Sequence, residues 1–380
     1  MNKYNIFDYL TWRDGIDFEM MPFNEIDNII FANLSYIRFK DIIPSDKNTI
    51  TIKDAIDAFL KTDITSLDIR DKQDIDFIKA VRNCSRFCNL KLTFHHEVYE
   101  EATATQFGAW MVELKHNLYY LAYRGTDNFL AGWREDLNIS FETVRAQELA
   151  HQYLEDAANN FLFAKFIVGG HSKGGNIAMY AAAHASKRTY NKILTIYNND
   201  GPGFDFNHVD KKIYEHISDK LISFTPAFSF VGQMMEQPKE MIIIESDAYH
   251  ILQHCPYNWQ LSGNSFIRLQ QFESTALAYK YALDNCLSSL DLAERKAFVD
   301  GIYEIILEAN TDDISQMVPG LIKNRKQVQA TLKALDPTTR EAIETFFSEL
   351  FDSMKDSIGY SIGNLGSSIY AKIFGHDKNK

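Results

Sequence analysis

The chain has 380 residues, of which 46% are hydrophobic and 24% charged, a composition typical of globular proteins with a sizeable core. Asp and Glu outnumber Lys and Arg by 51 to 39, giving a net charge of −12. This balance argues against a general nucleic-acid binder, because phosphate contacts need a basic surface. The 4 cysteines do not make a disulfide scaffold, and none has a companion at zinc-site spacing.

Nothing in the first 20 residues resembles a secretory signal, because Asp8, Arg13, Asp14 and Asp17 interrupt every apolar stretch. No window approaches the roughly 18 charge-free apolar residues that a membrane span needs. We therefore expect a protein without a transmembrane segment, located in the cytoplasm with reduced cysteines.

The first half of the chain predicts helices followed by strands. Apolar residues recur at helical spacing over 24–39, with Asn24 as a cap, and further short helices are expected over 50–60 and 72–83. From residue 91 the sequence becomes rich in β-branched and aromatic residues, which favours strands. A helix is expected again over 141–163.

The next segments alternate between strand and helix. Short apolar runs at 166–170, 192–198, 221–225 and 241–245 are typical of strands buried on both faces. This alternation predicts an α/β protein with a mainly parallel, doubly wound sheet. Beyond about residue 266 only amphipathic helices are indicated, so we expect two parts: a domain over 1–265 and a helical C-terminal extension over 266–380.

One motif carries chemistry: Gly170, His171, Ser172, Lys173 and Gly174 form a G-x-S-x-G pattern. An apolar run precedes it and a helix-like segment follows. A strand that enters a helix through so tight a turn exposes the serine hydroxyl above the sheet edge, and it needs small neighbouring residues. The start of the following helix adds positive potential. The alternative is a glycine-rich turn without catalytic function.

Together with this motif, three further segments resemble the α/β-hydrolase superfamily, its class 3 lipase-like branch and, most narrowly, the bacterial Mbeg1-like family. They are the opening stretch 7–39, the segment Tyr123–Asp127 with Trp133 and Asp136, and the Gln-His segment 253–259. The resemblance implies an α/β-hydrolase fold with Ser172 as the nucleophile. It also implies an oxyanion hole formed by the backbone N–H of Lys173 and by Thr126.

A serine hydroxyl needs an adjacent base, and α/β-hydrolases place nucleophile, acid and histidine in that chain order. His254 follows the last predicted strand by a short loop, so it fits the base. His208 and His216 precede the last two strands and fit badly, and His250 lacks the surrounding motif. Arg124 is better interpreted as scaffold, held by Asp127 or Asp136. His171 and Lys173 flank the nucleophile, and contact with substrate remains open for both.

The acid is the least defined member. In class 3 lipases it follows the next-to-last strand, and Ser229 stands at the corresponding position here. Asp200, at the end of the strand after the nucleophile's strand, is our candidate, because some hydrolases use an acid there. The alternative for Asp200 is a cap for the turn at 201–203. The remaining alternatives are Asp247, Asp205 or a dyad helped by Ser229.

The sequence therefore predicts a serine hydrolase that cleaves a small acyl ester or a lipid, without a cofactor. The adjacent His95 and His96 lack a third ligand, and we interpret them as a strand surface rather than a metal site. One alternative is a binding or scaffold protein with the fold but a weakened site. Another is an acyl-transfer or amide-cleaving enzyme. Acyl length and oligomeric state are not predicted.

The C-terminal segment 354–373 carries an apolar stripe at helical spacing but also three glycines that weaken a helix. Such a helix needs something to pack on. We expect it to dock on its own hydrolase domain or on a second subunit. The alternative is a peripheral membrane contact through this helix. The stripe consists of Met354, Ile358, Ile362, Leu365, Ile369 and Ile373.

Overall fold

The computed structural model describes residues 3–357, with gaps at 66–67, 71, 101–104, 126–144, 207–208, 230, 249 and 309–316 and at scattered positions between 275 and 289. The chain divides into two compact units. Residues 1–129 and 142–271 form the first unit, and residues 130–141 and 272–380 form the second.

The first unit is built on an eight-stranded sheet whose strands follow one another in chain order. The first four strands pair antiparallel, and the fourth to the eighth are parallel. This arrangement confirms the mainly parallel α/β sheet. The strands are β1 (Ile50–Thr51), β2 (Lys91–Glu100), β3 (Thr105–Lys115), β4 (Leu118–Tyr123), β5 (Lys165–His171), β6 (Ile193–Asn199), β7 (Leu221–Pro226) and β8 (Ile242–Ile244).

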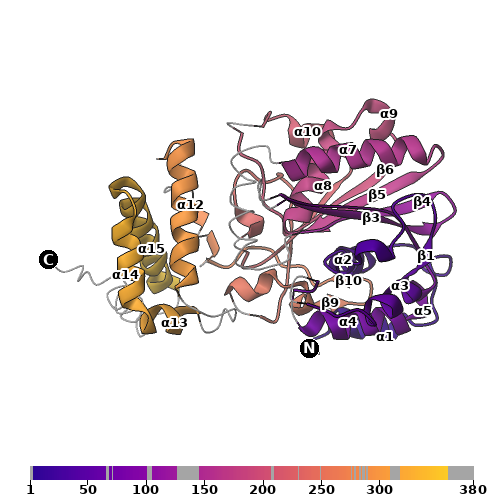
Figure 1. Cartoon of the computed structure of the whole chain (residues 1–380), viewed down its shortest axis with the longest axis horizontal. Coiled ribbons are helices and arrows are strands. Elements are labelled where there is room, and N and C mark those ends of the chain that lie inside the picture. The colour runs from indigo at the N-terminus through magenta and orange to yellow at the C-terminus, as the bar shows by residue number, and fades with distance from the viewer. Residues whose placement is uncertain are drawn as a thin grey trace. The chain divides into compact units, whose positions relative to one another are not determined.

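Helices cover both faces of this sheet, and the two layers come from different parts of the chain (Figure 1). The helices between the parallel strands lie on one face: α7 (Arg145–Asn160), α8 (Lys173–His184), α9 (Lys187–Tyr190) and α10 (Ile213–Ile217). The N-terminal helices lie on the other: α1 (Ile6–Trp12), α2 (Glu25–Leu34), α3 (Ile52–Phe59), α4 (Lys72–Asn83) and α5 (Ser85–Cys88). The strands keep their chain order across the sheet, so the second face is covered by the N-terminal helices and not by helices that follow a reversal of strand order.

Helix α2 shows how local sequence builds the N-terminal layer. Asn24 caps it as predicted, and its side chain accepts hydrogen bonds from the N–H groups of Ile26 and Asp27 in a capping box. The residues Ile26–Leu34 are all buried, and α2 packs on β4 and β5. The helix ends at Leu34, earlier than predicted, and Tyr36 follows as a buried turn residue.

Past β8 the chain forms two short 3₁₀ turns, η4 (His250–His254) and η5 (Pro256–Asn258). A small hairpin of β9 (Leu261–Ser262) and β10 (Ser265–Phe266) follows, which the sequence did not predict because each strand has only two residues. Leu261 donates its N–H to the carbonyl of Tyr4 at 2.9 Å. This segment therefore closes back onto the start of the chain.

The second unit is helical in its described part, as predicted. It contains α12 (Leu292–Leu307), α13 (Met317–Lys323), α14 (Arg325–Ala334) and α15 (Pro337–Ser357). Phe298 and Phe346 pack edge to face across α12 and α15 with ring centroids 5.8 Å apart. The stripe predicted over 354–373 lies almost entirely outside the described residues, which end at Ser357.

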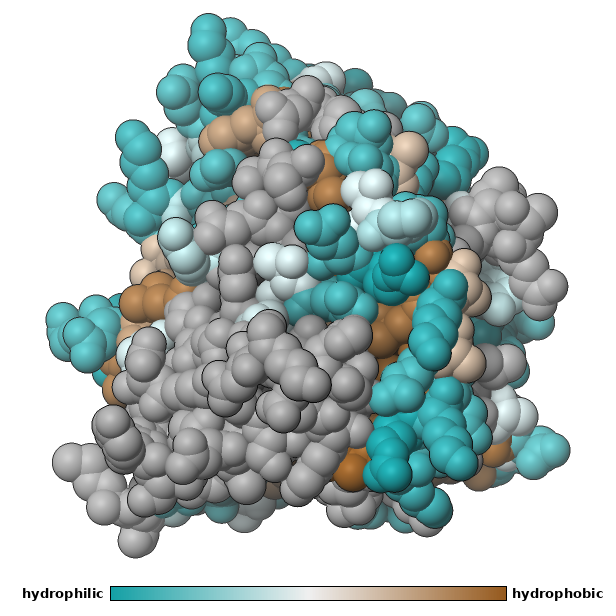
Figure 2. Space-filling model, turned by 90° about the vertical axis from the view of Figure 1, so that its left-hand side faces the viewer, coloured by the Kyte–Doolittle hydropathy of each residue, from teal (hydrophilic) through white to brown (hydrophobic). Residues whose placement is uncertain are grey.

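No helix in the described part of the chain is long and apolar enough to cross a membrane. Figure 2 shows one face of the molecule, where hydrophilic residues predominate among those coloured and hydrophobic residues form small areas between them.

Candidate active site

Ser172 occupies a strained turn between β5 and α8. Its φ of 57° and ψ of −131° are rarely adopted by residues other than glycine. The turn is closely packed, since a Cβ on Gly170 would collide with the backbone of Gly174, and one on Gly174 with the carbonyl of Tyr123. These contacts explain why glycines flank the serine. The local sequence thus forms the nucleophile-elbow geometry that its motif predicted.

Three of the predicted site residues lie in one hydrogen-bonded line. Ser172 Oγ is 3.0 Å from His254 Nε2, and His254 Nδ1 is 2.6 Å from Asp200 Oδ2. Because a carboxylate only accepts, Nδ1 carries the proton and Nε2 is left to accept from the serine hydroxyl. The three side chains come from the elbow, from the end of β6 and from η4.

Asp200 is fully buried and has a left-handed backbone with φ of 56°. Its N–H donates to the carbonyl of Phe224 on β7 at 2.8 Å. The alternative role, capping the turn at 201–203, is filled by Asn198, whose Oδ1 accepts from the N–H of Gly201 at 2.9 Å. The carboxylate of Asp200 faces His254.

Ser229 stands at the position where class 3 lipases carry the acid, but its side chain binds a backbone amide of the following turn. Its Oγ accepts from the N–H of Gly232 at 2.7 Å, at the start of the 3₁₀ turn η3 (Val231–Gln233). A Cβ on Gly232 would collide with Oδ1 of Asp200. The turn that follows β7 therefore forms a close-fitting wall against the Asp200 carboxylate.

The other candidates have different environments. Asp247 is exposed, and Asp205 is buried after the loop that follows β6. His216 lies exposed on α10. His250 begins η4, and the structure does not describe its side chain. His208 lies outside the described residues.

Of the two residues predicted to form the oxyanion hole, the structure describes only Lys173. Lys173 begins α8, so its backbone N–H lies at a helix N-terminus directly after the nucleophile. Its side chain is buried, and Nζ donates to the carbonyl of Gln106 at 2.9 Å. Thr126 lies outside the described residues, as do Asp127, Trp133 and Asp136.

Arg124 is buried beside this region and serves as scaffold. Its Nη2 donates to Oε1 of Glu97 on β2 at 2.8 Å, a partner that the sequence did not predict, and Arg38 binds the same oxygen at 2.7 Å. Burial alone would raise the pKa of Glu97, but the two arginines outweigh it and hold this pKa below its ordinary value.

His171 does not face an open site. It is 3% exposed, and each ring nitrogen lies within hydrogen-bond distance of a partner. Beneath it lies a buried cluster that sequence analysis missed, made of Tyr36, Arg70, Asp74 and Tyr257. These residues come from three segments, since Arg70 and Asp74 are an i,i+4 pair, and no local pattern brings that pair to Tyr36 and Tyr257.

The predicted histidine pair lies on the strand surface. His95 and His96 follow a bulge in β2 where Phe94 has a φ of 56°. They border a small cavity of about 150 Å³ with Tyr153 and Asp156 of α7. Burial is the main cause that lowers the pKa of His95 to about 4. No group of three or more metal-ligating side chains occurs among the described residues.

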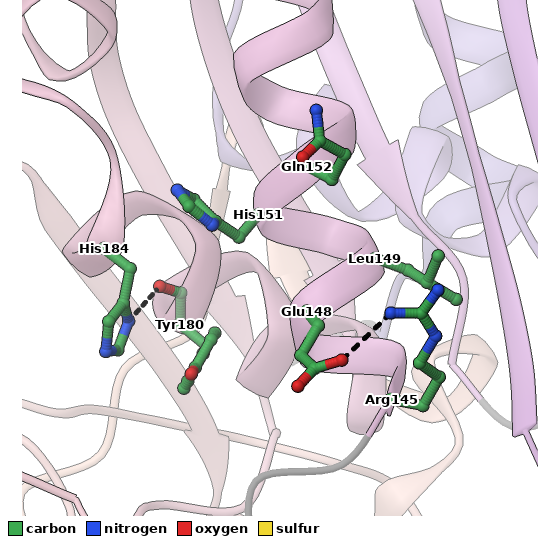
Figure 3. Close-up of a pocket in the computed structure, with 7 residues that line it drawn as sticks. All are labelled: Arg145, Glu148, Leu149, His151, Gln152, Tyr180 and His184. Carbon is green, nitrogen blue, oxygen red and sulfur yellow. Dashed lines mark hydrogen bonds and ion pairs between the residues drawn. The ribbon is translucent and has the colours of Figure 1, made fainter.

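A larger open cavity of about 460 Å³ lies between α7 and α8 (Figure 3). Its polar side chains bind one another, the backbone or neighbouring residues of α7 rather than converging on one point. Arg145 pairs with Glu148 at 3.0 Å, and His184 Nδ1 donates to the carbonyl of Tyr180 at 2.9 Å. The described residues that line this cavity do not include Ser172, Asp200 or His254.

Comparison with known proteins identifies the family. A family model described as Mbeg1-like matches residues 81–304. The chain belongs to the Mbeg1-like family. The matched residues include the elbow, Asp200, His254 and the segments 123–127 and 253–259, whereas the opening stretch 7–39 lies outside them. A solved structure titled "Crystal structure of M37 lipase" is similar with a TM-score of 0.32 and 14% identity, over 54% of this chain and 68% of that chain. A comparison with curated proteins found no match.

Proposed function

We propose that this protein is a serine hydrolase that cleaves carboxylic esters. The observation that carries the proposal is the line from Ser172 through His254 to Asp200, with distances of 3.0 Å and 2.6 Å. Such a line supplies the two things an unactivated hydroxyl lacks, a base within reach and a group that orients the base.

The proposed reaction has two halves. Ser172 Oγ attacks the ester carbonyl carbon while His254 Nε2 takes the hydroxyl proton, and the backbone N–H of Lys173 with Thr126 binds the developing oxyanion. His254 then gives the proton to the leaving alcohol, which leaves an acyl group on Ser172. A water molecule deprotonated by His254 releases the acid product and regenerates the serine. Asp200 stabilises the transient imidazolium throughout.

The test is covalent labelling combined with ester turnover. Ser172→Ala is expected to abolish both labelling by a fluorophosphonate and hydrolysis of p-nitrophenyl acyl esters, while circular dichroism stays unchanged. Ser262→Ala, at the exposed residue of β9, is the matched control and is expected to retain both. Labelling of Ser172→Ala at the wild-type rate would place the nucleophile elsewhere.

The alternative of a weakened binding protein rested on Ser229 in place of an acid. Asp200 at hydrogen-bond distance from His254 supports an active enzyme instead. The substrate proposed is a small acyl ester or a lipid, and a series of esters of increasing acyl length separates the two. Added hydroxylamine, which captures the acyl group as a hydroxamate, reveals acyl transfer.

The peripheral membrane contact through 354–373 also remains a proposal. Deletion of residues 358–380 is expected to lower the melting temperature if the segment docks on the protein. If the segment binds a bilayer, the deletion abolishes co-sedimentation with vesicles and leaves the melting temperature unchanged.

A further inference from the structure

A second histidine lies directly against His254. The rings of His171 and His254 have centroids 4.5 Å apart and an angle of 35° between their planes. Trp259 meets the ring of His171 edge to face at 5.7 Å. His171 precedes the nucleophile at the end of β5, so a rigid strand fixes its backbone.

The hydrogen bonds of His171 define one tautomer. Its Nε2 is 2.9 Å from the backbone carbonyl oxygen of His254. A carbonyl only accepts, so Nε2 carries the proton and donates. Its Nδ1 is 2.7 Å from the hydroxyl of Tyr36, which donates to it. The neutral ring therefore binds both partners, with the proton on Nε2.

The surroundings keep this ring uncharged. Complete burial lowers the pKa of His171 well below its ordinary value, and electrostatic interaction with the His254 ring and with Arg70 lowers it further. Arg70 stacks on the ring of Tyr36 at 3.8 Å and pairs with Asp74 at 2.9 Å. The groups that face His171 are thus Tyr36 after α2, Arg70 before α4, and His254 with Trp259 from the loop.

The loop that carries His254 needs such an anchor. It consists of two 3₁₀ turns that are joined to the preceding segment by the bridge between Ser246 and Trp259 at their far end, and loops are more mobile than the elements they connect. Trp259 Nε1 donates to the carbonyl of Gln253 at 2.8 Å, and Tyr257 donates its hydroxyl to Asp74. These bonds hold residues on either side of His254, whereas the bond from His171 holds the backbone of His254 itself.

We propose that His171 is a positioning residue of the proposed hydrolase, which fixes the backbone of His254 so that its Nε2 stays at Ser172 Oγ. This inference rests on the proposed function. With its carbonyl held by His171 and its Nδ1 by Asp200, His254 retains one orientation toward the serine. A neutral group is required here because a cation beside His254 would oppose the imidazolium formed during catalysis.

The kinetic test compares two substitutions. His171→Leu removes the donor and is expected to lower kcat by about 10- to 100-fold with little change in KM, because small displacements of catalytic groups cost about that much. His171→Gln retains an N–H donor near the position of Nε2 and is expected to recover most of this loss. The matched control is His184→Leu. The His184 ring binds a carbonyl of its own helix, so this variant should have the kcat of wild type.

A second measurement does not depend on activity. In ¹⁵N-histidine-labelled Ser172→Ala protein, the ring nitrogens of His171 are expected to show a proton on Nε2 and no titration between about pH 5 and 9. Titration in that range, or a proton on Nδ1, would overturn the inference. Tyr36→Phe removes the donor to Nδ1 and should change the Nδ1 shift while lowering kcat.

The two proposals fail in different ways. If wild-type protein neither reacts with fluorophosphonate nor cleaves esters, the proposed function falls and the positioning role falls with it. If wild type is active and folded His171→Leu shows the same kcat, only the positioning role is wrong. Should His171→Leu not fold, a kcat for folded Tyr36→Phe equal to that of wild type would overturn the positioning role as well.

Discussion

Two residues of the site carry unfavourable backbone conformations. Ser172 and Asp200 have φ values of 57° and 56°, and they lie on either side of His254. Such conformations cost about 1–3 kcal/mol each and persist only where the surroundings enforce them. Here the glycine contacts at the elbow and the β7 backbone enforce them, so the fold holds Ser172 and Asp200, the proposed nucleophile and acid, in fixed positions.

The role of Asp200 can be separated from that of Ser229 by isosteric change. Asp200→Asn keeps size and tolerates the left-handed backbone, but its amide favours the wrong tautomer of His254. We expect kcat to fall by about 10³- to 10⁴-fold. Ser229→Ala loses a bond to the Gly232 amide and should cost less than about tenfold. Steady-state ester hydrolysis measures both, and the reverse ranking would assign the acid role away from Asp200.

Gly232 provides a second test at the Asp200 carboxylate. A methyl group at this position would collide with Oδ1 of Asp200, so Gly232→Ala must displace either the carboxylate or the turn. We expect kcat to fall at least about tenfold, because the orientation of His254 is lost. The melting temperature serves as the folding control. Wild-type turnover in a folded Gly232→Ala protein would show that close packing of the turn after β7 against the Asp200 carboxylate is not needed for activity.

At the scale of elements, one buried ion pair ties the N-terminal layer together. Asp27 at the start of α2 accepts from Arg86 of α5 at 2.6 Å and from the hydroxyl of Tyr9 of α1 at 2.9 Å. Arg86 also donates to the carbonyls of Ile16 and Met21, each at 3.0 Å. The Asp27–Arg86 pair thus links three helices, α1, α2 and α5, and the loop between α1 and α2.

Breaking this pair is expected to be costly. Arg86→Met leaves the Asp27 carboxylate buried without its cation and should lower the free energy of unfolding by about 3–5 kcal/mol. Urea denaturation measures this change. Adding Asp27→Asn, which keeps the oxygen for the helix cap, removes the uncompensated charge and should restore part of the loss. A double variant less stable than Arg86→Met would contradict this account.

For the whole molecule, a half-buried neutral histidine, His95, couples stability to pH. His95 is held neutral by burial, with Arg124 and His96 adding to the effect and Glu97 and Asp41 opposing it, so its pKa falls to about 4. In the unfolded chain an ordinary histidine takes up a proton below about pH 6.5. The unfolded state therefore binds more protons between these values, and the free energy of unfolding falls as the pH drops from about 6.5 to 4.

This coupling predicts a specific variant. His95→Gln has no proton to take up and should reduce the loss of melting temperature between about pH 6.5 and 4. Exposed His116→Gln is the matched control and should leave the slope unchanged. Thermal melts at a series of pH values measure both. An unchanged slope in His95→Gln would show that other groups set the acid sensitivity.

The sequence by itself determined those features that short-range sterics and periodicity control. The apolar run at 166–170 became β5, the glycines around Ser172 produced the elbow, and Asn24 capped α2. The chain order expected of a nucleophile and its base also indicated His254, which the structure places at Ser172. The hairpin β9–β10 escaped prediction because two-residue strands leave no pattern.

The tertiary structure alone decided which partners meet across the fold. Whether Asp200 or another carboxylate reaches Nδ1 of His254 depends on where β6 ends relative to a loop that lies 54 residues later. The contact of His171 with Tyr36 spans 135 residues. Such contacts arise from packing between distant segments, and each segment taken alone is compatible with several alternatives. Local sequence therefore predicted the elbow at Ser172, the proposed nucleophile, and only the assembled sheet with its loops determined which groups contact His254, the proposed base.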